Sequence, residues 1–409
     1  MTNFPFQVST TDKKRLIAWQ NKYQSMMFDD VIPFWTRLCP DNKFGGYLNY
    51  IDRKGNIFSG IKSVWILGRG VWLFAHLYNT HKPEPQWLDL AKLGVDFIDK
   101  YCFDKDGTAF LATTRDGKPI NKGLGFFSEA FIMMGYAELA TAMNDKARYE
   151  QAKNLFAQIL KIYDTPAVIE PVMIFPAFHQ MKGQAAPMIM LSTAQVLRDA
   201  ANSFKLDDDI KWLDKLCARF VTEIGIFYKP ELGCLIEGLT PDTNEFIDEP
   251  DGRITCPGHS CESAWFIMDE ARHQNNEQWN QLAISIVKGA MNFGWDKECG
   301  GMLTFVDCKH LPTDSLEHDI KIWWPHNEAL VATLAAWRAT GDSQWLDWHE
   351  KIFDWTMSKF PDHEYGEWYG YLRRDGAVSN DVKGNMWKGL FHIPRALYKA
   401  ASLIEDTLK

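Results

Sequence analysis

The sequence predicts an all-α protein, an (α/α)6 barrel of six inner and six outer helices with short β-hairpins on one rim. Hairpin-like stretches recur at intervals of about 64 residues, and two helical patterns lie between most neighbouring stretches. With 409 residues, 46% of them hydrophobic, the chain can bury the large core that such a barrel needs. We expect residues 1–409 to form a single barrel domain.

Five stretches combine a glycine, a short alternation and a second turn, which is typical of a small β-hairpin. They are DNKFGGYLNYIDRKGN, DKDGTAFLATTRDGKP, KPELGCLIEGLTPDTN, DKECGGMLTFVDCKHLP and EYGEWYGYLRRDGAVSN, with anchor glycines Gly45, Gly107, Gly233, Gly300 and Gly366. The interval between the second and third glycines is about twice the others, so we expect a sixth, degenerate hairpin near residues 165–180.

The segments between the hairpins carry apolar residues at the i, i+3, i+4 and i+7 positions of amphipathic helices. The predicted helices span 12–38, 61–80, 84–102, 126–142, 145–162, 186–203, 208–224, 258–274, 276–294, 324–340, 342–358 and 386–404. If one hairpin precedes each pair, all hairpins gather on one rim and the pairs close into a ring. The helix after each hairpin is then an inner helix, and its first turn lies at the mouth of the barrel.

Three histidines occupy related positions at the starts of these inner helices. His259, His326 and His392 are spaced by about 66 residues, although the chain has only 11 histidines. A single histidine in an apolar helix is more often a buried residue bonded to a backbone carbonyl. Three at one position of a repeat indicate a shared pocket instead.

Charged and aromatic residues accompany the histidines at the same helix starts, among them Arg69, Glu262, Trp324 and Glu328. Histidines titrate near neutral pH and therefore suit proton transfer. Two of them on different helices can reach opposite faces of a carbon next to a carbonyl, and an arginine can stabilise the enolate oxygen. We expect proton transfer beside a sugar carbonyl, which means epimerisation or aldose–ketose isomerisation.

Other classes of enzyme find less support in the sequence. The chain lacks the G-x-S-x-G stretch of many serine hydrolases and the P-loop motif, and its G-R-G stretch is too short for a dinucleotide fingerprint. The spacing of His259, Glu262 and His326 is unspecific as a metal site, and we expect no metal. An inverting glycosidase with paired carboxylates is the main enzymatic rival on this fold.

The net charge and the cysteine pattern limit which partners and which cellular location are expected. The net charge is −9 and no cluster of Lys and Arg stands out, so neither nucleic acid nor an anionic membrane is expected as a partner. No 18-residue apolar run and no secretory leader pattern are present. The eight cysteines form no C-x-x-C pair, so reduced thiols and a cytoplasmic location are expected.

The chain resembles the N-acylglucosamine 2-epimerase family in six stretches that run in order from residue 34 to residue 397. They are FWTRLCPDNKFGGYLNYIDRKGN, KSVWILGRGVWLFAHLYN, AAPMIMLSTAQVL, PGHSCESAWFIM, KIWWPHNEALVA and KGNMWKGLFHIPRAL. The resemblance implies an (α/α)6 barrel, in agreement with the repeat. It also implies two catalytic histidines, here His259 and His392, and essential roles for Arg69 and Glu328.

The resemblance implies a reaction as well. Members of the family interconvert N-acetyl-D-glucosamine and N-acetyl-D-mannosamine by moving the C2 proton of the open-chain sugar through an enolate-like intermediate. Several are activated by ATP that is not consumed, and homodimers are usual. We predict that the substrate contacts Arg69, Glu262, Trp324, His326 and Glu328, and that Lys383 and Lys388 are candidates for binding ATP.

Two alternatives stay open. Relatives that act on mannose-type free sugars, as isomerases or 2-epimerases, commonly carry a further histidine on the inner helix that here reads PMIMLSTAQV. This chain has Met188, Met190 and Ser192 there, and Met side chains can receive an acetyl methyl, which favours the N-acyl sugars. The other alternative is a non-catalytic sugar- or protein-binding module, although both catalytic histidine positions are filled.

Overall fold

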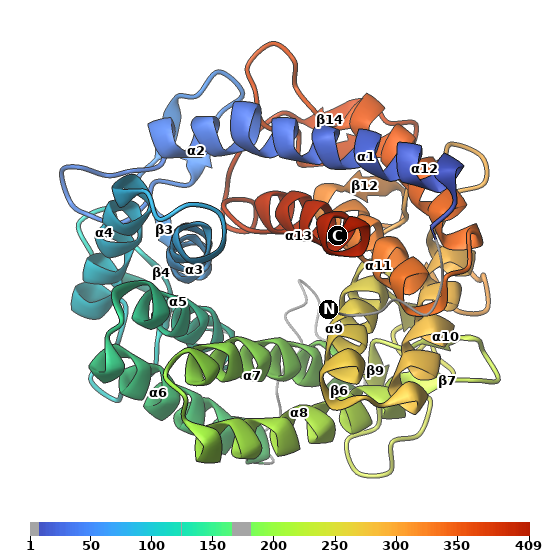
Figure 1. Cartoon of the computed structure of the whole chain (residues 1–409), viewed down its shortest axis with the longest axis horizontal. Helices are drawn as coiled ribbons and strands as arrows, with labels where there is room; N and C mark the ends of the chain where they lie inside the picture. Colours follow the sequence, from blue (N-terminus) through green and yellow to red (C-terminus); the bar gives the residue numbers. More distant parts are fainter. Residues whose placement is uncertain (1–7, 124, 166–180) are drawn as a thin grey trace.

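Two concentric rings of helices form the computed structural model, which describes residues 8–123, 125–165 and 181–409 (Figure 1). The inner ring consists of α3 (Val64–Thr80), α5 (Phe127–Met143), α7 (Ala185–Ser203), α9 (Pro257–Gln274), α11 (Trp323–Thr340) and α13 (His392–Leu408). Outside it lie α1 (Thr10–Ser25) with α2 (Ile32–Leu38), α4 (Pro85–Tyr101), α6 (Lys146–Asp164), α8 (Asp207–Phe227), α10 (Glu277–Gly294) and α12 (Gln344–Lys359). The predicted (α/α)6 barrel is confirmed.

The burial patterns of the two rings differ because their surroundings differ. In α8 the buried residues Leu213, Cys217, Phe220 and Ile224 follow one stripe, as expected for a helix with one face in water. Inner helices are buried on almost every side, since two neighbours and the outer ring cover them. Gly68 on α3 allows a very close approach of α5, because a Cβ there would meet the Phe131 carbonyl carbon at 2.5 Å.

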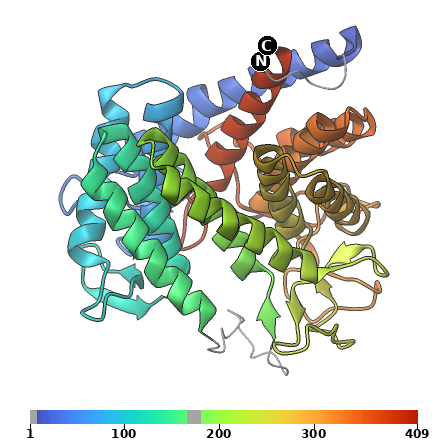
Figure 2. The same ribbon diagram turned by 60° about the horizontal axis from the view of Figure 1, so that its bottom comes forward.

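The strands gather at one end of the ring. In Figure 2 the teal and yellow-green strands lie at the lower end, and the C-terminus of α13 lies at the upper end. Hairpins form from β1 (Tyr50–Ile51) and β2 (Ile57–Ser59), β4 (Phe110–Thr113) and β5 (Pro119–Lys122), β7 (Tyr228–Lys229) and β8 (Cys234–Leu235), and β13 (Tyr371–Arg373) and β14 (Val378–Asn380). The expectation of hairpins on one rim is therefore confirmed for these units.

The anchor glycines adopt a backbone conformation that other residues rarely adopt. All five lie in the left-handed region, with φ between +68° and +81°, where a side chain would be strained. The Gly300 unit departs from the prediction, because its strand β11 (Val306–Asp307) pairs with β10 (Ile254–Thr255) and not within its own stretch. The expected sixth hairpin falls in residues 166–180, outside the described residues.

Among the described residues, strand pairing also joins several neighbouring units. The pairs that do so are β3 (Lys62–Ser63) with β4, β6 (Lys182–Gly183) with β9 (Gly238–Leu239), β10 with β11, and β12 (Ile320–Ile322) with β13. Ile51 pairs with Gly384 and so links the first unit to the segment before α13. These strand pairs fix the positions of neighbouring inner-helix starts relative to one another, and so they position the side chains at those starts.

Three predicted helix bounds need correction. The first predicted helix is interrupted by a π-helical segment, η1 (Met26–Val31), and α3 begins three residues later than predicted. The last predicted helix begins only at His392, because the Asn385 side chain accepts hydrogen bonds from the backbone N–H groups of Trp387 and Lys388. Such a local turn competes with helical bonding. His392 is therefore the first residue of its helix.

No helix among the described residues is long and apolar enough to cross a bilayer.

Candidate active site

Two histidines from different inner helices flank one tryptophan at the hairpin end of the barrel. The ring centre of Trp324, at the start of α11, lies 4.9 Å from that of His259 and 5.9 Å from that of His392. The histidine side chains keep 24% and 11% of their surface exposed, whereas many of their neighbours are fully buried. The structure therefore brings together three residues that lie far apart in the sequence.

Each of these histidines has a carboxylate on Nδ1. Nδ1 of His392 lies 2.8 Å from Oε1 of Glu328, and Nδ1 of His259 lies 2.9 Å from Oε2 of Glu237. A hydrogen bond at Nδ1 fixes the orientation of the ring and leaves Nε2 for other partners. Both carboxylate bonds use Nδ1, and His259 also has a side-chain hydrogen bond with the Cys256 thiol.

Beside His392 lies a buried cluster of opposite charges. Nη2 of Arg395 lies 2.5 Å from Oε1 of Glu262 and 2.7 Å from Oε1 of Glu328. The other oxygen of Glu328 accepts a hydrogen bond from the indole N–H of Trp265 at 2.9 Å. The charge of Glu328 is thus shared among three donors, and His392 receives only part of it.

The two histidines consequently differ in protonation. Burial and the positive charge of Arg395 hold the pKa of His392 well below its usual value, so this imidazole is neutral at pH 7. Burial also opposes the charge of His259, but the carboxylate of Glu237 and the neighbouring Cys256 outweigh it and raise the pKa well above 6.5. The site therefore contains one neutral and one charged imidazole.

Arg69 on α3 contributes a positive charge that has no ion-pair partner among the described residues. Its guanidinium carbon lies 3.9 Å from the ring centre of Phe131, 4.5 Å from that of Phe391 and 5.5 Å from that of Trp65. The side chain is 7% exposed, and its buried Nε has no hydrogen-bond partner among the described residues. Burial lowers its pKa to about 9, against the attraction of Glu262. An arginine held in this way is available to an anionic group of a ligand.

The prediction that His326 contacts substrate is wrong in this structure. The side chain is fully buried, its Nδ1 donates to the carbonyl of Ile322, and its Nε2 accepts from the N–H of Met302. Its ring stacks on Trp355 of the outer helix α12. Both nitrogens are used by the backbone, so His326 holds a hairpin onto the start of α11 and has no free atom for a ligand.

Lys383 and Lys388 are not available to ATP either. Both side chains are fully buried. Lys383 pairs with Asp362 at 2.9 Å, and Lys388 pairs with Glu367 and donates to the carbonyl of Lys383 at 2.8 Å. These lysines fix the segment that leads to His392, and the prediction that they bind phosphate is wrong.

Two groups of side chains have donors that suit a metal ion. The first consists of Glu262, Glu328 and His392, and the second of Glu237, Cys256 and His259; in each, the donor atoms lie within 4.8 Å of one another. In the first group the Arg395 guanidinium already supplies the positive charge.

Sequence reasoning missed Glu237 and gave Arg395 no role. Glu237 follows β8 in a stretch, CLIEGL, that reads as the second half of a hairpin. An acidic residue at the end of a hairpin strand beside the barrel mouth is the only signal, and it does not indicate which histidine the residue meets. Arg395 lies one turn after His392 on α13, at the i+3 spacing that places two side chains on one helix face.

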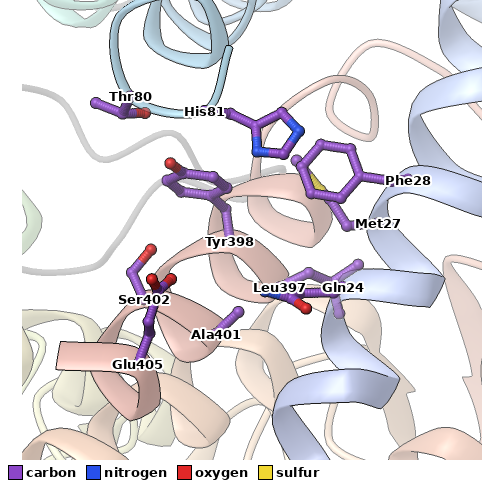
Figure 3. A pocket seen from close by; sticks show the side chains of 10 residues that line it. All are labelled: Gln24, Met27, Phe28, Thr80, His81, Leu397, Tyr398, Ala401, Ser402 and Glu405. Carbon is purple, nitrogen blue, oxygen red and sulfur yellow. The ribbon is translucent and has the colours of Figure 1, made fainter. Parts of the chain in front are cut away.

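A separate cavity of about 240 Å³ lies at the other ends of α3 and α13 (Figure 3). Tyr398, Ser402 and Glu405 of α13 line it, together with Phe28 and His81, whose rings are stacked at 4.1 Å. None of the residues described above lines it, so it is distinct from the histidine site.

Comparisons with known proteins agree with this geometry. Residues 45–396 match the sequence profile of the N-acylglucosamine 2-epimerase family (GlcNAc 2-epimerase). The N-acylglucosamine 2-epimerase of Bos taurus is 29% identical over 405 residues, covering 97% of this chain and 94% of the relative. The Homo sapiens enzyme is 30% identical over 394 residues, covering 94% and 90%.

Solved structures share the fold. The cellobiose 2-epimerase of Spirochaeta thermophila has a TM-score of 0.81 at 19% identity and covers 98% of this chain and 100% of its own. A D-mannose isomerase has a TM-score of 0.75 at 18% identity and covers 97% and 100%. Because the family profile spans most of the chain and the curated relatives align over nearly their whole length, the chain belongs to the N-acylglucosamine 2-epimerase family and is an enzyme of the epimerase and isomerase class.

Proposed function

We propose that this enzyme interconverts N-acetyl-D-glucosamine and N-acetyl-D-mannosamine by moving the proton at C2 of the open-chain sugar. One observation carries the proposal: His259 and His392, from two different inner helices, both lie beside Trp324 with their Nδ1 atoms on carboxylates, and their pKa values are shifted in opposite directions. Epimerisation through two bases needs a group that takes a proton on one face of the carbon and a second group that gives one on the other face.

The reaction proceeds in two proton transfers. Neutral His392 takes the proton from C2 onto Nε2, and the electron pair of the broken C–H bond moves toward the C1 carbonyl to form an enolate. The charge of Arg69 stabilises the enolate oxygen, because a fixed cation in a water-poor site acts strongly on developing negative charge. Charged His259 then delivers its Nε2 proton to the opposite face of C2. Exchange of protons with water restores both histidines for the next turnover.

The remaining polar residues of the site hold this pair in place. Glu328 keeps the Nδ1 proton of His392, and Arg395 limits how much negative charge that imidazole meets. Glu262 lies opposite Arg395, from which it accepts a bond. Trp324 offers an apolar face close to both histidines, which suits the C–H side of a sugar ring.

The N-acetyl group of the substrate is proposed from the relatives. Two curated relatives at 29% and 30% identity carry the name N-acylglucosamine 2-epimerase. Met188 and Met190, which the sequence suggested as an acetyl pocket, are 2% and 0% exposed and pack in the core of the barrel. They therefore give no support to the acyl preference. ATP as an activator that is not consumed, a homodimer and a cytoplasmic location belong to the same proposal.

Proton NMR of the purified enzyme with N-acetyl-D-mannosamine in D₂O, with and without ATP, tests the proposal. We expect N-acetyl-D-glucosamine that carries deuterium at C2, because the proton delivered by His259 comes from solvent. A faster reaction with ATP, at unchanged ATP concentration, supports activation. If both samples leave the sugar unchanged, the N-acyl substrate is wrong, and mannose and cellobiose are the next substrates. A ketose product would identify an aldose–ketose isomerase.

A further inference from the structure

We infer that Glu237 is the positioning residue that makes His259 the proton donor of the site. The inference rests on the proposed function for its catalytic meaning. It concerns a residue on a hairpin segment, outside the inner helices that carry the two histidines, Arg69 and Trp324.

The backbone of Glu237 is fixed between two neighbouring units of the barrel. Its N–H donates to the carbonyl of Ile254 and its carbonyl accepts from the N–H of Gln184, each at 2.9 Å. Ile254 belongs to β10, just before α9, and Gln184 directly precedes α7. The carboxylate is thus held at the start of the helix that carries His259, with Oε2 at 2.9 Å from Nδ1.

Glu237 has fewer hydrogen-bond partners than Glu328, because among the described residues its carboxylate binds only the side chain of His259. Its other oxygen, Oε1, is buried and has no hydrogen-bond partner among the described residues. Glu328, in contrast, accepts from Arg395 and from Trp265 as well as from His392. Among the described residues, the carboxylate at His259 therefore has no cationic partner, whereas the one at His392 is paired with Arg395.

The groups around His259 other than Glu237 carry no full negative charge, although the Cys256 thiol also raises the pKa of His259 through a hydrogen bond. They are the Cys256 thiol at the N-terminus of its own helix, the uncharged Trp324 ring from α11, and His392. Burial raises the pKa of Cys256, so its thiol is uncharged at neutral pH. Glu237 therefore makes the largest contribution that favours a proton on both nitrogens of His259, one bound to Glu237 and one available for transfer from Nε2.

Two substitutions separate the charge of Glu237 from its shape. In Glu237→Gln the amide oxygen can still accept the Nδ1 proton, so the ring keeps its orientation while the charge is lost. In Glu237→Asp the charge stays but the side chain is shorter by one methylene. Glu231→Gln is the matched control, since it removes an exposed carboxylate from the same hairpin.

The pH profile of kcat/KM tests the inference. In the wild type, activity falls at high pH when His259 loses its proton. In Glu237→Gln we expect this alkaline limb to move down by more than about one pH unit and kcat at about pH 8 to fall on the order of 10²-fold, with KM little changed. Glu237→Asp should recover part of the shift, and Glu231→Gln should match the wild type. An alkaline limb that stays in place in Glu237→Gln overturns the inference.

A second measurement needs no turnover and so separates this inference from the proposed function. The ring ¹⁵N signals of His259, assigned through His259→Asn, report its protonation directly. We expect a doubly protonated ring at about pH 8 in the wild type and a singly protonated one in Glu237→Gln. A neutral His259 in the wild type at pH 7 contradicts the inference, whereas an inactive protein with a charged His259 contradicts only the proposed substrate.

Discussion

Nδ1 of His392 and Oε1 of Glu328 lie 2.8 Å apart, between the first residue of α13 and the first turns of α11. The pair joins two neighbouring inner helices at the hairpin end of the barrel. Because Glu328 accepts at Nδ1, the basic lone pair of the neutral imidazole lies on Nε2. This relationship makes His392 suited to accept a proton from a substrate.

Replacing His392 with Asn should abolish epimerisation and leave the fold intact. General acid–base catalysis contributes about 10²- to 10⁴-fold, and the loss should lie at the upper end because the neighbouring carboxylates of Glu262 and Glu328 are paired with Arg395. Deuterium incorporation at C2, measured by NMR, gives the rate, and circular dichroism and thermal melting check the fold.

Replacing His259 with Asn provides the matched comparison. The two variants should be inactive in both directions, since each turnover uses both histidines whichever epimer is the substrate. A folded His392→Asn protein with wild-type turnover would remove His392 from the mechanism.

Replacing Glu328 with Gln should cost both activity and stability. The amide keeps the size of the side chain but leaves Arg395 with Glu262 alone and weakens the bond to Trp265. A buried bond to a charged group is worth about 1.5–3 kcal/mol, so the free energy of unfolding should fall by an amount of that order. Urea denaturation measures it. An unchanged stability would mean that water replaces the lost charge.

Replacing Arg69 with Met should remove activity without loss of stability. Arg69 forms no ion pair among the described residues, and burial lowers its pKa to about 9, so the folded protein bears the cost of a desolvated cation. Methionine keeps the contacts with the Phe131 and Phe391 rings and carries no charge. We expect kcat/KM to fall at least about 10²-fold and the free energy of unfolding to stay level or rise.

Denaturation of Arg69→Met and of the wild type, measured side by side, gives the comparison. A destabilised Arg69→Met protein would show that the arginine is structural, in which case its loss of activity carries no information on the enolate.

Two buried histidines should make the protein sensitive to acid. Burial lowers the pKa of His326 and of His349 to about 3, against about 6.5 in an unfolded chain. Between these values the unfolded chain takes up protons that the folded one cannot, so stability is lost as the pH falls below about 6.5. Each histidine should reduce the free energy of unfolding by roughly 1.4 kcal/mol per pH unit.

Urea denaturation at several pH values between about 7 and 5 tests this dependence. His326→Gln removes one titrating group, so the free energy of unfolding should depend less steeply on pH than in the wild type. The variant is also less stable at pH 7. His318→Gln, at an exposed position, is the control and should keep the wild-type slope. A His326→Gln slope equal to that of the wild type would contradict the assignment.

Replacing Lys388 with Met should destabilise the protein by about 3 kcal/mol or more, because it leaves Glu367 buried without its partner. Replacing both residues, as in Lys388→Met with Glu367→Met, should cost less than the sum of the single changes. Denaturation of the four proteins gives the coupling energy. Additive effects would show that the two side chains act independently.

The repeat made much of the fold predictable. Glycines that recur at a fixed interval need a left-handed backbone, and Gly45, Gly107, Gly233, Gly300 and Gly366 all adopt one. Helical periodicity between them predicted the two rings, because burial on one face or on all faces follows from the spacing of apolar residues.

His326 shows where that reasoning stops. By repeat spacing it corresponds to His259 and His392, yet it is the fourth residue of α11, whereas His259 is the third of α9 and His392 the first of α13. Helix position alone does not decide the direction of the side chain, since His259 and His392 differ by two positions and both lie beside Trp324. His326 is held away from the site because the Ile322 carbonyl and the Met302 N–H bind both of its nitrogens. The helix starts depend on local turns and on strand pairs with the next unit.

The sequence by itself determined the two rings of helices, the positions of four of the hairpins and the two histidines at the starts of α9 and α13. Only the tertiary structure decided that Glu237 faces His259, that Arg395 shares Glu328 with His392, and that Lys388 is buried with Glu367. Periodicity is a property of neighbouring residues, and a sequence displays it directly. The charge partners at this site come from segments up to 133 residues apart, and their distances are set when the ring closes.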